Sequence, residues 1–108
     1  MIYELRTYVA NEGKLPALLA RFRNITIPYF EKYGIQNVGY WTSNTPGEEN
    51  HLIYLLAFKD AKQRESAWAG FMEDPQRKAD FAETDKNGKL NSQVIAKVMT
   101  PTDFSALK

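Results

Sequence analysis

Eight aromatic and basic side chains are the part of this sequence best suited to recognise a small molecule. They combine flat rings with guanidinium groups and polar donors: Tyr3, Arg6, Tyr8, Tyr40, Trp41, Tyr54, Arg64 and Trp68. An aromatic pocket with a few placed polar groups is typical of a site for a small, partly apolar ligand, in which Arg6 or Arg64 would receive a carboxylate or enolate oxygen. The alternative is that the rings pack a core or a dimer interface, with Arg6 paired to Glu4 or across that interface.

The single histidine, His51, is a candidate for proton transfer because the ordinary pKa of histidine lies near neutrality. His51 follows the loop Glu48-Glu49-Asn50, where a solvent-facing histidine is the simpler interpretation. One histidine and no cysteine leave a metal ion dependent on several carboxylates, and no spacing in the chain supplies them. We therefore expect neither a metal site nor a cofactor.

Several function classes lack their sequence signals. The chain has no Gly-x-Ser-x-Gly motif and no cysteine nucleophile, and its six glycines are scattered rather than gathered in a phosphate-binding loop. A formal net charge of +1 without blocks of like charge argues against nucleic acid and membrane surfaces as partners. The segment 51–58 also lacks the glycine and basic residues of RNA-binding strands.

Size and composition indicate one globular domain covering residues 1–108. The chain is 44% hydrophobic and 25% charged, which is the ordinary range of soluble domains. No apolar run approaches the roughly 20 residues that a membrane-spanning helix needs. No signal-peptide pattern precedes the first strand, so we expect no leader and a cytoplasmic protein.

The stretch Ile2–Val9 is the strand around which we expect the other elements to be organised. Its odd positions are mostly apolar, and its even positions mix types: Ile2, Glu4, Arg6 and Tyr8. Because successive side chains of a strand point to opposite faces, this alternation predicts a buried odd face. The even face, with its acid, base and phenol, would then meet a partner or a ligand.

A helical period replaces the alternation between residues 15 and 33. Its apolar stripe consists of Leu15, Leu18, Leu19, Phe22, Thr26, Tyr29, Phe30 and Tyr33. The opposite, exposed side would carry Arg21, Asn24, Glu31 and Lys32. Pro28 removes a backbone hydrogen bond inside this helix, so we expect a kink near Asn24–Pro28, and Gly34 ends the helix in a left-handed conformation.

Three more strands and two more helices follow. We expect strands at 35–43, 51–58 and 90–100, and helices that begin at the capping residues Asp60 and Asp74. The strand at 51–58 is apolar on both faces, which indicates a central position. Gly39 within the preceding strand indicates a bulge, or a point where another group comes close.

The element order strand, helix, strand, strand, helix, strand predicts the α+β class. It is the βαββαβ order of the ferredoxin-like fold, whose four-stranded antiparallel sheet has the strand order 4-1-3-2. Both helices cover the same face of such a sheet. Because large exposed apolar faces are rare on monomers, we expect a second copy to stack sheet on sheet, giving a homodimer or a higher homo-oligomer.

Several segments, taken in their order and spacing, resemble the NIPSNAP family. They are Tyr3-Glu4-Leu5-Arg6-Thr7-Tyr8, Gly39-Tyr40-Trp41, Phe58-Lys59-Asp60-Ala61 with Arg64, and Asp74-Pro75. The family usually carries a tryptophan shortly after Asp-Pro, whereas this chain has Gln76-Arg77-Lys78. The resemblance implies a dimeric α/β barrel in which two ferredoxin-like sheets face each other, and it implies no agreed activity.

Three interpretations of function remain open at this point. The first is an uncharacterised NIPSNAP-like dimeric barrel that binds a small apolar or aromatic metabolite. The second is a cofactor-independent oxygenase or isomerase, because the wider barrel group includes such enzymes; a tyrosine or His51 would move a proton and Arg6 would stabilise an oxyanion. The third is a non-catalytic oligomeric interaction protein. That barrel group also includes haem proteins, but no residue near His51 supports haem ligation.

Overall fold

A computed structural model describes all 108 residues and contains one four-stranded antiparallel sheet in the order β2-β3-β1-β4. The strands are β1 (Ile2–Ala10), β2 (Gln36–Thr42), β3 (His51–Phe58) and β4 (Asn91–Met99). The helices are α1 (Leu15–Arg21), the π-helical turn η1 (Phe22–Thr26), α2 (Ile27–Lys32), α3 (Ala61–Glu73) and α4 (Pro75–Thr84). The predicted α+β class, ferredoxin-like element order and sheet order are confirmed.

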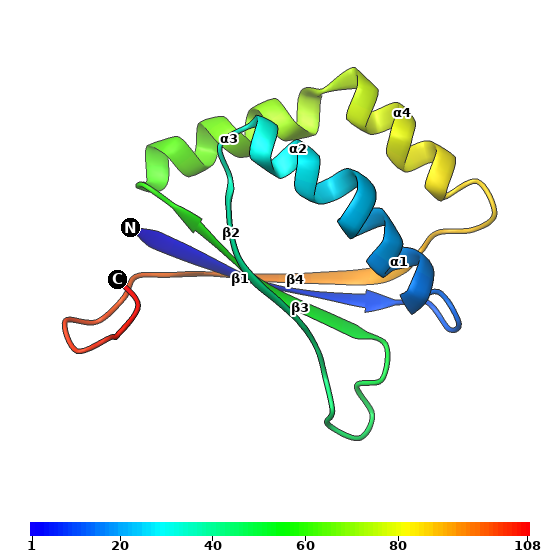
Figure 1. Ribbon diagram of the computed structural model, residues 1–108, viewed down its shortest axis with the longest axis horizontal. Coiled ribbons are helices and arrows are strands. Elements are labelled where there is room, and N and C mark those ends of the chain that lie inside the picture. The colour runs from blue at the N-terminus through cyan, green and yellow to red at the C-terminus, as the bar shows by residue number, and fades with distance from the viewer.

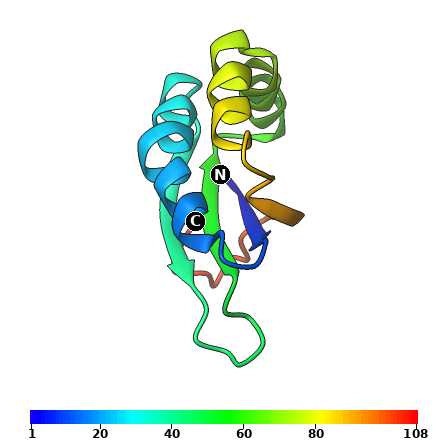
Figure 2. The same ribbon diagram turned by 90° about the vertical axis from the view of Figure 1, so that its right-hand side faces the viewer.

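The molecule has two layers, with every helix on the same side of the sheet (Figures 1 and 2). The core lies between the layers and is rich in aromatic rings. Phe22 and Phe30 of the first helical segment approach Tyr54 of β3, with ring centroids 5.0 and 6.3 Å apart. None of the helices combines the length and the apolar character that crossing a bilayer requires.

The faces of β1 are the reverse of those expected from its alternation. The even side chains point toward the helices: Glu4 accepts hydrogen bonds from Arg64 and Trp68 of α3, and Tyr8 packs edge-on against Phe22 at 5.2 Å. The prediction of a buried odd face was wrong because both faces carry apolar residues, and the polar even residues find partners inside the molecule. Alternation alone does not tell which face the helices cover.

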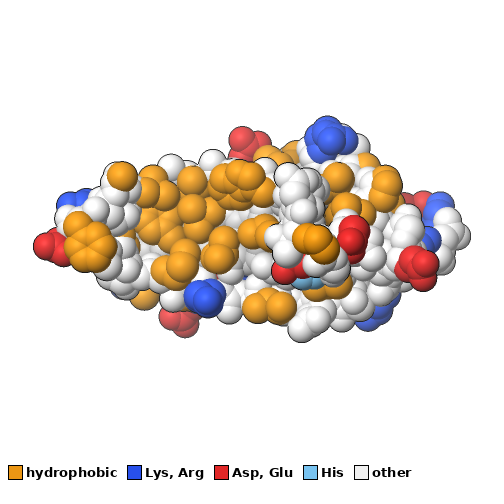
Figure 3. Space-filling view, turned by 90° about the horizontal axis from the view of Figure 1, so that it is seen from below, with side chains coloured by type: hydrophobic (Ala, Val, Ile, Leu, Met, Phe, Trp, Pro, Cys, Tyr) orange, Lys and Arg blue, Asp and Glu red, His pale blue; other side chains and the backbone are white.

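The side of the sheet away from the helices, here called the open face, carries apolar side chains from all four strands. By the strand register these are Tyr3, Leu5, Val9, Trp41, Ile53, Leu55, Ala57, Ile95 and Met99. Figure 3 views the molecule from this side and shows a broad apolar patch. At one end the tail 100–108 turns under the sheet (Figure 1), where Tyr3, Leu55 and Leu107 help to line a hollow of about 270 Å³.

The kink expected near Asn24–Pro28 takes the form of the π-helical turn η1. The backbone N–H of Ile27 bonds to the carbonyl of Phe22, five residues earlier. Pro28 then falls in the first turn of α2, directly after this turn. The apolar stripe therefore stays in the core on both sides of the break, with Leu18 and Phe30 no more than 1% exposed.

Strand β2 contains the irregularity that Gly39 predicted. Its register with β3 shifts between Asn37 and Gly39, and the group that approaches the glycine is the ring of Trp41. A Cβ atom on Gly39 would lie 2.5 Å from the Cη2 atom of that ring. The absence of a side chain here lets the indole lie flat along the strand on the open face.

The junction of α3 and α4 is held by Asp74. Its carboxylate caps α4 by accepting from the backbone N–H groups of Gln76 and Arg77, at 2.9 and 3.0 Å. It also accepts from the side chains of Lys32 and Tyr33, and these bonds hold the pKa of Asp74 well below its usual range. In the first turn of α4, Arg77 is buried and lies over the rings of Phe71 and Phe81.

Gly70 of α3 provides a test of this packing. A Cβ atom there would lie 2.6 Å from Cδ1 of Tyr33, whose hydroxyl is bonded to Asp74 and whose ring is therefore held in place. We expect Gly70→Ala to lower the free energy of unfolding by about 1–3 kcal/mol through overpacking. This loss would occur although alanine is favoured over glycine in helices by about 1 kcal/mol.

Urea unfolding of the variant measures the effect. Ser66→Ala, at an exposed position of the same helix, is the matched control and should stay within about 0.5 kcal/mol of the wild type. Gly70→Ala combined with Tyr33→Leu should lose less than the sum of the two single changes. A Gly70→Ala protein more stable than the wild type would show that the Tyr33 ring moves freely.

Candidate functional site

A buried carboxylate joins the sheet to α3 and organises the site. Glu4 of β1 has no exposed surface. Its Oε1 accepts from Nε of Arg64 at 2.7 Å and from the indole N–H of Trp68 at 3.0 Å, and its Oε2 accepts from Nη1 of Arg6 at 2.7 Å. We call Glu4, Arg6, Arg64 and Trp68 the Glu4 cluster. Three short bonds satisfy a charge that would otherwise be costly to bury.

Arg6 connects this cluster to the aromatic core. Its Nε donates to the hydroxyl of Tyr54 at 2.7 Å, and its guanidinium carbon lies 4.7 Å from the ring centre of Trp68 and 5.7 Å from that of Tyr8. These bonds use Nε and Nη1, and the hydroxyl of Tyr8 also lies beside the guanidinium. The side chain is 15% exposed, which leaves one edge of the guanidinium able to bind a ligand.

The charges of the site follow from its contacts. Burial alone would raise the pKa of Glu4, but the hydrogen bonds from Arg64, Arg6 and Trp68 outweigh it and lower the pKa, so the carboxylate is ionised at neutral pH. Burial raises the pKa of Tyr54 well above its usual value, so its phenol is neutral. One carboxylate held between two guanidinium groups leaves an excess of one positive charge in the Glu4 cluster.

A hollow of about 340 Å³ lies over the cluster, between β1 and α3. Besides the four cluster residues, Glu65 and Met72 line it. On the neighbouring strand β4, Val98 pairs with Glu4, so it lies on the same side of the sheet, where it is 51% exposed. The hollow thus offers two guanidinium groups and the carboxylate of Glu65 beside apolar side chains, and the guanidinium groups can receive an anionic group on a flat apolar body.

The structure gathers five of the eight aromatic and basic candidates around this site. These are Arg6, Tyr8, Tyr54, Arg64 and Trp68. Tyr40 stacks on Tyr54 with ring centres 5.0 Å apart, further from the hollow, and burial raises its pKa. The predicted alternative that Arg6 pairs with Glu4 is confirmed, yet both partners also form the site.

The last two of the eight candidates, and the proton-transfer candidate His51, lie elsewhere. Tyr3, Trp41 and His51 are on the open face, so the sheet separates them from Arg6. His51 is 22% exposed, and its Nδ1 lies 4.0 Å from a carboxylate oxygen of Glu48. Within one chain, His51 therefore cannot act on a group that Arg6 holds.

Sequence reasoning missed Glu4 as the centre of the site. The available signal was an acid and a base two residues apart, which share one face of a strand. It also placed Arg21 on the exposed side of its helix. The structure corrects this, because Arg21 is 4% exposed and its guanidinium donates to Thr84, Asp85 and Asn91.

Comparisons with known proteins agree on one family. The NIPSNAP family model matches residues 3–106. A NIPSNAP family protein with unknown function from Agrobacterium tumefaciens is 29% identical, with 100% of this chain and 94% of that chain covered and a TM-score of 0.84. Another NIPSNAP family protein from the same organism is 22% identical over 99% of this chain and 98% of that chain, with a TM-score of 0.85.

The fold is also shared more widely. A monooxygenase of Streptomyces coelicolor, solved in complex with nanaomycin D, superposes with a TM-score of 0.68 over 99% of this chain and 92% of that chain, at 11% identity. At that identity the likeness concerns the fold alone. The comparison with curated proteins found no match.

Removing the charge of Glu4 tests the cluster. We expect Glu4→Gln to lower the free energy of unfolding by about 2–3 kcal/mol, because two guanidinium groups lose their counter-charge. This is less than for a fully buried pair, since the Arg64 side chain is 31% exposed. Thermal unfolding of the wild type and of Glu4→Gln from pH 3 to pH 7, followed by circular dichroism, measures this loss of stability.

The dependence of folding stability on pH tests whether Glu4 is ionised. Because the folded pKa of Glu4 is lowered, its contribution is complete above the ordinary glutamate pKa of about 4.3 and is lost as the pH falls through the lowered value. The difference between wild type and Glu4→Gln should therefore shrink on acidification. Glu65→Gln, at an exposed position of α3, is the control, and a difference independent of pH would contradict the ionised buried carboxylate.

Proposed function

This chain belongs to the NIPSNAP family, and from that premise we propose that it is a homodimeric protein that binds a small aromatic or apolar carboxylate. The observation that carries the proposal is the Glu4 cluster, where an excess guanidinium charge lies beside a tryptophan ring under an open hollow. In this proposal all 108 residues act as one domain. The ligand enters from the helix side of the sheet, between α3 and β4.

The chemistry of the cluster favours a carboxylate as the polar end of the ligand. Arginine presents several N–H groups in a planar fork that matches a carboxylate, and charge-assisted bonds of this kind are stronger than neutral ones. The side chains of Arg6 and Arg64 are 15% and 31% exposed, and both line the hollow. The apolar body of the ligand would lie on Met72 and Val98, which are 55% and 51% exposed.

Binding accounts for this geometry better than proton-transfer catalysis. Tyr54 is a buried neutral phenol already bonded to Arg6, and His51 lies across the sheet, so neither is placed to remove a proton from a ligand at Arg6. The oxygenase or isomerase alternative rests on the fold that the chain shares with a monooxygenase at 11% identity. The interaction-protein alternative rests on the open face alone.

The homodimer half of the proposal rests on the open face. Its strand residues are almost all apolar or uncharged, with Lys97 the one acid or base among them apart from His51. Depletion of charge is the mark of the centre of a protein interface. A second copy fits because the same patch is self-complementary about a two-fold axis, and stacking two such faces would produce the barrel that the family resemblance implies.

Light scattering tests the dimer. At micromolar concentration the wild type should show about twice the monomer mass of 12.4 kDa. Leu55→Lys, which places a charge on the open face of the central strand β3, should give a folded monomer, because an unpaired ammonium in the interface costs several kcal/mol.

Met72→Lys is the matched control, since it adds the same charge at an apolar position of α3 that is 55% exposed on the other side of the sheet. It should leave the mass unchanged. A wild type that is monomeric at micromolar concentration refutes the dimer. An unchanged mass for Leu55→Lys would show that the dimer interface does not include the open face.

Calorimetric titration tests the ligand class with 2-naphthoate and its neutral analogue 2-naphthamide as probes. We expect naphthoate to bind and naphthamide to bind at least about tenfold more weakly, since one charge-assisted contact is worth roughly 1.5–3 kcal/mol. Arg64→Gln should reduce the affinity for naphthoate to that of the amide.

Lys62→Gln removes the same charge from an exposed position of the same helix and should leave the affinity for naphthoate unchanged. Equal affinities for the acid and the amide would eliminate the carboxylate contact. Retained binding in Arg64→Gln would exclude the Glu4 cluster as the site.

A further inference from the structure

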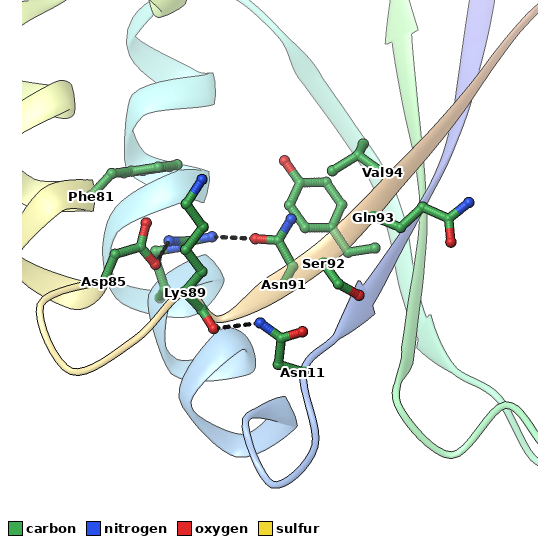
Figure 4. Close-up of a pocket in the computed structure, with 10 residues that line it drawn as sticks. Asn11, Phe81, Asp85, Lys89, Asn91, Ser92, Gln93 and Val94 are labelled. Carbon is green, nitrogen blue, oxygen red and sulfur yellow. Dashed lines mark hydrogen bonds and ion pairs between the residues drawn. The ribbon is translucent and has the colours of Figure 1, made fainter.

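A second hollow, of about 450 Å³, opens where the end of α1, helix α4 and the start of β4 meet. We call it the Arg21 pocket. Figure 4 shows Asp85 and Asn91 on opposite sides of the guanidinium that both of them bind, with the side chain of Lys89 running over the pocket toward Phe81. Gln93 points away from the pocket, so the polar groups that face a ligand come from the other residues.

Arg21 is buried, and the hydrogen bonds that its guanidinium makes are long. Its Nη1 donates to Thr84 at 3.3 Å and to Asp85 at 3.2 Å, its Nη2 donates to Asn91 at 3.2 Å, and its buried Nε has no partner. Charge-assisted bonds are usually about 2.7–2.9 Å long. The guanidinium groups of Arg6 and Arg64 bond to Glu4 at 2.7 Å in the same molecule. Arg21, at 4% exposure, therefore has Asp85 at 3.2 Å as its nearest anion, a longer ion pair than those of Arg6 and Arg64.

The other polar groups of the pocket supply both donors and an acceptor. The ammonium of Lys89 takes part in no ion pair or hydrogen bond, and Lys89 is exposed. Asn91 accepts from Arg21 through Oδ1, which leaves its Nδ2 available as a donor. Asp85 uses Oδ1 for Arg21 and for the backbone N–H of Leu90, which leaves its Oδ2 available as an acceptor.

This set of groups defines a ligand. Two cations and one carboxylate leave an excess of one positive charge, which matches a monoanion. Hydroxyl groups both donate and accept, so a ligand that carries several of them can satisfy Asn91 Nδ2 and Asp85 Oδ2. Tyr8, Phe81 and Val94 add apolar contact along one wall. The volume lies within the range of about 300–1,000 Å³ found for small-molecule sites.

We propose that the Arg21 pocket binds a small hydroxycarboxylic acid, of about the size of a six-carbon sugar acid. The carboxylate lies between Arg21 and Lys89 and gives Arg21 a second anion besides Asp85. One hydroxyl group of the ligand accepts from Asn91, and another donates to Asp85. Binding is reversible and involves no covalent step.

This site is separate from the Glu4 cluster and does not depend on the function proposed there. The two hollows share no lining residue. The Arg21 pocket is polar and takes a hydroxylated ligand, whereas the Glu4 cluster takes an apolar carboxylate. Arg64→Gln should therefore leave binding at the Arg21 pocket unchanged, and changes at Lys89 should leave naphthoate binding unchanged.

Titration of the ¹⁵N-labelled protein with D-glucuronate, followed by NMR, tests the proposal. We expect shifts at the amides of Lys89 and Asn91 that saturate with one site. Lys89→Gln should weaken binding about fivefold or more, and Asn91→Asp should abolish it, because a second carboxylate then faces the ligand. Lys86→Gln, an exposed lysine of the same loop that pairs with Glu83, is the matched control and should bind as the wild type.

Three further probes separate the ligand classes. Glucose lacks the carboxylate, cyclohexanecarboxylate lacks the hydroxyl groups, and inorganic phosphate tests a plain anion site; each should bind at least about fivefold more weakly than glucuronate. Equal binding of any one of them overturns the hydroxy-acid assignment. Absence of shifts at millimolar glucuronate, or unchanged affinity in both Lys89→Gln and Asn91→Asp, overturns the site. Because Lys89 is exposed, loss of folding does not explain a loss of binding in its variant.

Discussion

The three hydrogen bonds accepted by the carboxylate of Glu4 are the constraint on which the rest of the structure depends. A charge with no exposed surface is stable only when its partners are fixed, and here the partners come from β1 and α3. The same bonds therefore place α3 over the sheet and hold Arg6 against the hydroxyl of Tyr54. Fold and site are set by one interaction, so a change that weakens one weakens the other.

The helix-facing row of β1 links two hollows of different character. Glu4 and Arg6 lie under the hollow beside α3, whose other walls are Arg64, Glu65, Trp68 and Met72, and Tyr8 lines the hollow beside Arg21. The difference comes from how the arginines are paired. Arg6 and Arg64 share the carboxylate of Glu4 at 2.7 Å, whereas Arg21 pairs with Asp85 at the longer distance of 3.2 Å.

Sequence patterns predicted most of the fold because each element carries its own local signal. Asp74 caps a helix by accepting from backbone N–H groups, and Gly34 ends another helix with a φ of 74°. The run of apolar residues on both faces of β3 indicates a central strand. The site was less predictable because it depends on pairing across the chain. The partners of Glu4 lie in α3, and those of Arg21 lie in or near β4, so neither pairing has a local pattern. The faces of β1 were assigned wrongly because its open face is as apolar as a core face.

The sheet order has a consequence for synthesis of the chain. β1 is made first, yet its two neighbours in the sheet are the third and the last strands. Until α3 leaves the ribosome, Glu4 has only Arg6 among its three partners, and β1 lies unpaired with its apolar side chains accessible. Non-local pairing of this kind slows folding and lengthens the time during which wrong associations form. Nascent chains of this protein are thus most dependent on chaperones early, before β3 is complete.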